Sequence, residues 1–204
     1  MERAQLKAMA KEQIKGNIGI LFVCSLIIGL IGGVLTMIPV AGSIAYLVVA
    51  PVLGVALCAI YLNLTQGQKP VVGDLFTKFD QLVPALVSTL LVALFTFLWS
   101  LLLIIPGIVK SLSYSMSSYI LADNPGITGK EALERSKAMM EGHKMELFVL
   151  QLSFIGWHLL GAITMGIAYI WILPYMSATV ANFYNSIKGS VDAVPVESIP
   201  ETTI

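Results

Sequence analysis

The chain has 204 residues, of which 57% are hydrophobic and only 12% are charged, with a mean hydropathy of +0.86. Soluble domains carry about 25% charged residues, so this composition indicates an integral membrane protein and leaves no room for a separate soluble catalytic domain. The formal net charge is zero, which argues against a nucleic-acid partner, because such proteins need a basic surface. The composition therefore predicts the lipid bilayer as the surroundings of this chain.

Apolar runs set the expected architecture, because a membrane-spanning helix needs about 20 apolar residues. Six runs have this character, at about 18–38, 44–64, 82–105, 106–122, 145–162 and 167–187. We therefore expect an all-α, polytopic membrane helix bundle of about six transmembrane helices arranged as three hairpins, with cytoplasmic amphipathic helices. The expected parts are an N-terminal amphipathic helix (1–16), the transmembrane bundle (17–187) and a disordered polar tail (188–204).

Residues 2–15 suit a helix with one apolar face. Its apolar residues recur at helical spacing while cations occupy the other faces: Leu6, Met9, Ala10 and Ile14 against Arg3, Lys7, Lys11 and Lys15. Two interpretations stay open, namely a helix that lies on an anionic leaflet or a cytosolic segment that only sets the orientation of the chain.

The charges in the loops predict the topology. Six crossings place the N-terminal helix, the 65–81 loop, the 123–144 segment and the tail on one side of the membrane. That side then holds eleven of the 12 Lys and Arg residues, and only Lys110 lies elsewhere. Because cytoplasmic loops carry an excess of Lys and Arg, we expect both termini in the cytoplasm.

The fourth predicted span is unusually polar for a membrane helix. It carries one lysine and a run of hydroxyl groups, on Lys110, Ser111, Ser113, Tyr114, Ser115, Ser117, Ser118 and Tyr119. At about 16 residues it measures about 24 Å, which is short against a hydrocarbon core of about 30 Å. We therefore expect this helix to be buried among other helices or to face water.

Ionisable and hydroxyl side chains at membrane depth are the candidate functional residues. Burying Lys110 unpaired is costly, which favours a functional role, whereas snorkelling to the outer interface is the structural alternative. His158, near the middle of the fifth span, is a candidate for proton relay or for a structural hydrogen bond. We expect His158 to point at the face of the fourth span that carries Ser113, Tyr114 and Ser117, because unsatisfied polar groups are costly in hydrocarbon.

The 123–144 segment carries a candidate cytoplasmic motif, formed by Asp123, Asn124, Thr128, Glu131, Gly142 and His143. Pro125 ends the preceding helix, and Thr128 with Glu131 fits a capping box that begins a new helix over about 129–141. Gly142 then ends that helix. One face of it is expected to lie against the bundle or the membrane, through Ala132, Leu133, Ser136, Met139 and Met140.

Residues 105–157 also carry a resemblance. The run IPGI…SYSMSSYILADNPGITGKEALERSKAMMEGHKMELFVLQLSFIGW resembles the DUF975 family of bacterial integral membrane proteins, which have no assigned activity. More loosely, PGI, EALERS and GHKMELF are similar to the membrane region that precedes the catalytic domain of some glycerophosphodiester phosphodiesterases. The resemblance implies a helical bundle in a bacterial cytoplasmic membrane. It supplies no catalytic residues, since the phosphodiesterase barrel has no counterpart here.

No catalytic constellation stands out in the sequence. A nucleophile elbow, a glycine-rich phosphate loop, a carboxylate dyad and an HExxH motif are all missing, and His143 with Glu141 and Glu146 is interpreted as a juxtamembrane polar cluster. We therefore expect no enzyme activity, cofactor or metal. Two functions remain: a module that organises or regulates lipids or partners, including further copies of itself, and a small transporter with a polar path along the fourth span.

Overall fold

The computed structural model describes residues 2–102 and 104–189, and every regular element within this part of the chain is helical. The elements in order are α1 (Arg3–Ile14), α2 (Ile18–Thr36), α3 (Ala41–Thr65), η1 (Val72–Phe76), η2 (Phe79–Gln81), α4 (Leu82–Leu102), α5 (Ile104–Tyr114), α6 (Ser117–Asp123), α7 (Gly129–Met139), α8 (Lys144–Leu152), α9 (Ile155–Ile163) and α10 (Tyr169–Lys188). The predicted all-α class is confirmed. The predicted disordered tail covers residues 188–204; Lys188 is the last residue of α10, and residues 190–204 lie outside the described residues.

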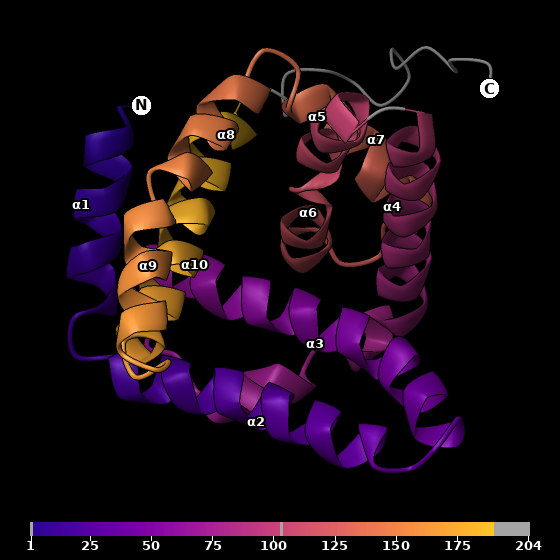
Figure 1. The fold of residues 1–204 in the computed structure, drawn as a ribbon, viewed down its shortest axis with the longest axis horizontal. Coiled ribbons are helices and arrows are strands. Elements are labelled where there is room, and N and C mark those ends of the chain that lie inside the picture. Colours follow the sequence, from indigo (N-terminus) through magenta and orange to yellow (C-terminus); the bar gives the residue numbers. More distant parts are fainter. Residues whose placement is uncertain (1, 103, 190–204) are drawn as a thin grey trace.

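The first two apolar runs form a pair of long helices. In Figure 1, α2 and α3 pack side by side and run at a steep angle to α4 and α10. Their turn is tight, because a Cβ atom on Gly42 would overlap the carbonyl oxygen of Leu35. Glycine is therefore required where the two helices meet.

Four helical segments in the described part of the chain are long and apolar enough to cross a membrane: Ile18–Thr36, Ala41–Thr65, Val72–Leu101 and Lys144–Ile163. The count of six spans and their arrangement as three hairpins stay predictions. The prediction of one continuous helix over 106–122 is wrong, because this run is divided into α5 and α6 at Ser115 and Met116.

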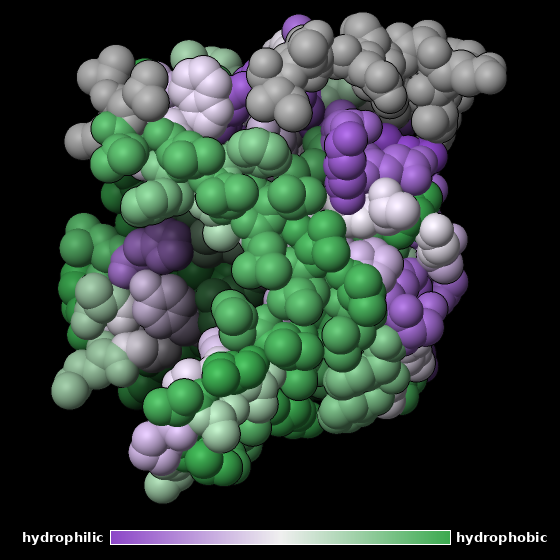
Figure 2. Space-filling model, turned by 90° about the vertical axis from the view of Figure 1, so that its right-hand side faces the viewer, coloured by the Kyte–Doolittle hydropathy of each residue, from purple (hydrophilic) through white to green (hydrophobic). Residues whose placement is uncertain are grey.

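Large apolar side chains cover the outside of α4. They include Val83, Val87, Leu90, Leu94, Phe97, Leu98 and Leu101, all of them exposed. Figure 2 shows a broad apolar surface on the side of the molecule where α4 lies. In water such a surface is costly, so this face fits the hydrocarbon of a bilayer.

The N-terminal helix α1 packs on α10 rather than standing apart from the bundle. Its residues Leu6, Ala10 and Ile14 are buried. The amides of Gln13 and Asn182 bond each other in both directions, at 3.1 and 2.7 Å. Three of the four residues of the predicted apolar face are therefore covered by protein, whereas Met9 is 40% exposed. Most of this face packs on α10 and not on a lipid leaflet.

The amphipathic helix α7 packs along α4. At its start, a Cβ atom on Gly129 would overlap the carbonyl oxygen of Pro84 and lie 2.6 Å from the backbone nitrogen of Ser88. The face predicted to be buried is confirmed, since Ala132, Leu133, Ser136, Met139 and Met140 are all buried.

Lys110 lies on α5, which packs against α7 and α8, the helices that carry Lys137 and Lys144. Its ammonium group is 4.8 Å from the centre of the Trp99 ring, near the end of α4. The predicted sides of the membrane stay predictions.

Cysteine labelling from each side of the membrane tests the predicted topology. We expect engineered cysteines at positions 72 and 130 to react from the same side, opposite to one at position 41. The contacts of Gly129 with Pro84 and Ser88 keep the start of α7 close to the start of α4. A background lacking Cys24 and Cys58 serves as the control. Reaction of positions 72 and 130 from opposite sides would contradict the assignment.

Candidate functional site

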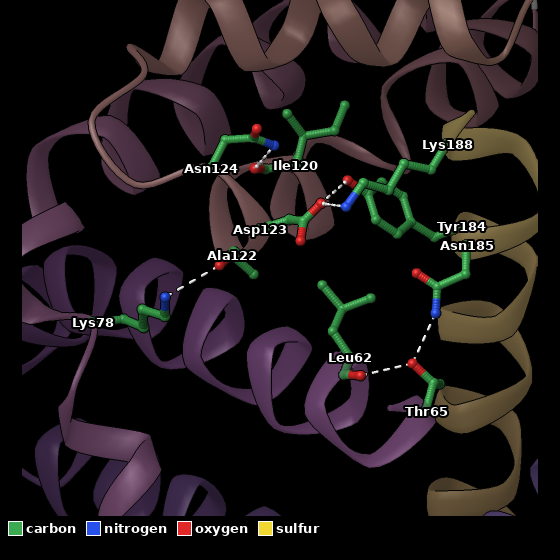
Figure 3. Close-up of polar contacts among 10 residues, drawn as sticks. All are labelled: Leu62, Thr65, Lys78, Ile120, Ala122, Asp123, Asn124, Tyr184, Asn185 and Lys188. Atoms are coloured by element: carbon green, nitrogen blue, oxygen red, sulfur yellow. Dashed lines mark hydrogen bonds and ion pairs between the residues drawn. The ribbon is translucent and has the colours of Figure 1, made fainter. Parts of the chain in front are cut away.

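The end of α6 is joined to the end of α10 by charged and polar side chains. The Tyr184 hydroxyl donates a 3.0 Å hydrogen bond to Oδ2 of Asp123, and the Lys188 ammonium pairs with the same oxygen (Figure 3). The Asp123 side chain is 17% exposed, so the pair is shielded from water more than a surface ion pair is. Asp123 therefore anchors α10 to the middle of the chain.

Two further bonds bring α3 and the 65–81 loop to the same place. Nζ of Lys78 donates to the carbonyl oxygen of Ala122 at 3.1 Å, and Nδ2 of Asn185 donates to the Thr65 hydroxyl at 2.7 Å (Figure 3). A cation at the C-terminus of a helix is favourable, because the last carbonyl groups there lack partners. These contacts, together with those of Asp123, are called the Asp123 network below.

Asn124 closes α6 by a local bond. Its Nδ2 atom donates to the carbonyl oxygen of Ile120 at 3.0 Å. The turn that follows contains Pro125 and Gly126, the latter with a φ of +96°. The predicted turn after the fourth span is thus present, with Asn124 bonded locally and Asp123 bonded to α10.

The hydroxyl-rich segment is bonded to protein. The fully buried Ser136 of α7 accepts a 3.2 Å bond from the Met116 nitrogen and donates a 2.9 Å bond to the Ser113 carbonyl oxygen. The hydroxyls of Ser113 and Ser117 bond carbonyl oxygens one turn earlier, at 2.9 Å each. Ser136 therefore satisfies two backbone groups at the break between α5 and α6.

Tyr114 is also part of this packing. It is buried, and its ring lies 6.0 Å from that of Phe95 on α4. The prediction that the fourth span is buried among other helices holds for this stretch, with α4 and α7 as the covering elements.

The predicted contact between His158 and the fourth span is wrong. Nδ1 of His158 lies 3.3 Å from the hydroxyl of Tyr169, on α10, and the histidine is exposed. The reason is local, because α9 turns back directly into α10 through residues 164–168 and brings His158 beside Tyr169. His158 is therefore not joined to Ser113 or Ser117.

Half of the predicted capping box at the start of α7 is present. The Thr128 hydroxyl accepts a 3.2 Å bond from the Glu131 nitrogen. The Glu131 carboxylate pairs with Arg135 at 2.7 Å instead of returning to the cap. The cap is therefore carried by Thr128 alone.

Replacing Thr128 with alanine is expected to destabilise α7 by about 1 kcal/mol, because an N-terminal amide loses its acceptor. Hydrogen exchange over residues 129–135 measures this directly, and should become faster in the variant. Thr128→Ser, which keeps the hydroxyl, is the control. Unchanged exchange in the alanine variant would show that the cap contributes nothing.

His143 and Gly142 mark the end of α7. Gly142 has a φ of +83°, as expected for a residue that ends a helix, and Nδ1 of His143 lies 3.1 Å from Oε2 of Glu146. Among the described residues, no group of three or more His, Cys, Asp or Glu side chains is placed to hold a metal ion. The His143 pair is thus a contact between the turn and α8.

Lys7 fixes α1 on its other side. Its ammonium group lies 4.5 Å from the centre of the Phe154 ring, at the break between α8 and α9. Burial, and then the charge of Arg3, lowers the pKa of Lys7 below its ordinary value. Cation–π contact of this kind adds to the docking of α1 on the bundle.

Sequence reasoning missed several of the residues that hold these contacts. They are Gln13, Lys78, Asn182, Tyr184 and Lys188, and it gave no role to the Ser136 hydroxyl. The available signal was polar residues near the ends of otherwise apolar helices, which need a partner when buried. That signal marks such residues without showing which ones pair.

The helical fold and its four apolar segments define the class, which is an all-helical membrane protein. Residues 101–190 match the model of a family described as "Protein of unknown function (DUF975)". This match agrees with the resemblance that residues 105–157 carry. Neither a curated protein nor a solved structure matches the chain, and the likeness to phosphodiesterase membrane regions stays a prediction.

Proposed function

We propose that the chain is a non-catalytic module of the bacterial cytoplasmic membrane that organises or regulates lipids or partner membrane proteins. The observation that carries this proposal is the position of Ser136. A transport path needs polar groups that are free to meet a solute, whereas Ser136 is fully buried and bonded to two backbone groups of α5 and α6. The most polar segment therefore serves packing.

The outer face of α7 is the surface that such a module would present. Lys130 and Glu134 form an ion pair there with side chains 78% and 47% exposed, and Lys137 is exposed on the same helix. The opposite face is buried in the protein. A fixed, charged helix face suits lipid headgroups, a partner protein or a second copy of the chain.

The proposal places both termini in the cytoplasm. Support comes from the cations of α1 and the 65–81 loop, since positive residues favour the cytoplasmic side. The docking of α1 on α10 through Gln13 and Asn182 also fits termini that share one side.

The test combines reconstitution with lipid and protein analysis of the full chain. Purified protein in mild detergent is analysed by mass spectrometry, then placed in sealed vesicles for proton and small-solute flux. Vesicles that stay sealed, with one lipid class or membrane protein bound at constant stoichiometry, support the module. Solute or proton flux that Ser113→Leu abolishes would overturn it in favour of the transporter.

A further inference from the structure

Three lysines from three different helices gather at one place. Lys110 lies on α5, Lys137 near the end of α7 and Lys144 at the start of α8. Lys137 and Lys144 lie on either side of the short turn that joins α7 to α8, and α5 packs against both of these helices. Residues distant in sequence thus form one cationic group, called the Lys110 cluster below.

No carboxylate neutralises this cluster within the described residues. Three other cations have acidic partners there: Lys130 pairs with Glu134, Arg135 with Glu131 and Lys188 with Asp123. Lys110, Lys137 and Lys144 form no such pair in the part of the chain that the structure describes. Like charges held close together repel each other, so an anion bound between them would stabilise the arrangement.

The Lys110 cluster lies where two apolar segments end. Trp99 is close to the end of the candidate span Val72–Leu101, and Lys144 is the first residue of the candidate span Lys144–Ile163. The ammonium of Lys110 lies 4.8 Å from the Trp99 ring centre. Tryptophan is enriched at the level of lipid headgroups, so this aromatic contact fits headgroup depth.

Exposed apolar side chains surround the charges. Ile105, Ile108 and Val109 of α5 are 74%, 45% and 41% exposed, and Met145 beside Lys144 is 67% exposed. A free soluble anion would leave these side chains in water, whereas acyl chains would cover them. The surface therefore combines charge for a phosphate group with hydrocarbon for the chains attached to it.

We propose that Lys110, Lys137 and Lys144 bind the phosphate headgroup of an anionic phospholipid, whose acyl chains lie against the exposed apolar residues of α5 and α8. This proposal specifies the class of lipid that the membrane module would bind, and it therefore rests on the proposed function. Trp99 sets the depth of the headgroup by holding Lys110 over its ring.

The test compares lipid binding by the full chain and by two triple variants. Lys110→Gln, Lys137→Gln and Lys144→Gln together remove the cluster, and Lys11→Gln, Lys69→Gln and Lys130→Gln remove the same charge elsewhere. Binding to vesicles of phosphatidylglycerol and of phosphatidylcholine is measured for proteins with equal helix content. Each lysine near an anionic surface raises the binding affinity about fivefold. We therefore expect the affinity for phosphatidylglycerol to fall roughly 100-fold in the variant that lacks the Lys110 cluster, and not in the other variant.

A second measurement needs no variant and so does not depend on folding of the triple variants. Phosphatidylglycerol should protect the amines of Lys110, Lys137 and Lys144, but not that of Lys130, from acylation in the parent protein. Equal loss in both triple variants, or no protection, would overturn the site. Displacement of the lipid by inorganic phosphate would overturn the lipid assignment in favour of a soluble anion. Neither result changes the outcome of the flux experiment in sealed vesicles. Failure of the lipid site can therefore be distinguished from failure of the proposed function.

Discussion

Ser136→Ala is expected to lower the free energy of unfolding by about 2–4 kcal/mol. The variant leaves the Met116 nitrogen and the Ser113 carbonyl oxygen without their partner, in a buried place where each unsatisfied group costs about 1–3 kcal/mol. The loss should be measured by denaturant unfolding in detergent micelles, followed by circular dichroism.

The matched control for this change is Ser111→Ala on the same polar segment. Ser111 is exposed, so its replacement should stay within about 0.5 kcal/mol of the parent. Ser136→Thr keeps the hydroxyl and should recover part of the stability. Equal stability of Ser136→Ala and Ser111→Ala would show that the break between α5 and α6 does not depend on Ser136.

Gly129→Ala is expected to destabilise the protein by about 3 kcal/mol, at the upper end for overpacking. The new Cβ atom would overlap the carbonyl oxygen of Pro84 and lie 2.6 Å from the nitrogen of Ser88. Both neighbours are backbone atoms of α4, so no side chain can rotate away and α7 must shift as a whole. Thermal unfolding and hydrogen exchange of α7 should both report the change.

Gly156→Ala in α9 is the control for the glycine substitution. A Cβ atom there meets nothing within 4 Å. Because alanine favours a helix over glycine by up to about 1 kcal/mol, this variant should be as stable as the parent or slightly more stable. If both glycine variants behave alike, α7 is not held against α4 as closely as the geometry requires.

The long elements follow directly from local sequence. The apolar runs that predicted helices over 18–38 and 44–64 are α2 and α3 with small changes at the ends. The 3.6-residue period likewise identified the buried face of α7, including Ser136. In both cases the pattern lies in residues that are close together in the sequence, so one sequence is sufficient to predict the helix and its buried face.

The remaining features depend on contacts between distant residues. Nothing near Ser115 breaks a helix in the way that proline or glycine would, and the break is stabilised by Ser136 from another helix. Lys110 lies beside the helices of Lys137 and Lys144 because α5 packs against both α7 and α8. His158 meets Tyr169 because α9 turns directly into α10. These contacts cannot be predicted from residue types and their spacing along the chain.

The bond between Ser136 and the break also sets an order of events during synthesis. Ser136 follows Met116 by 20 residues and Ser113 by 23, so α5 and α6 leave the ribosome before their partner exists. Hydrocarbon offers no water to satisfy the open backbone groups. The two backbone groups at the break therefore gain this partner only once α7 has been synthesised.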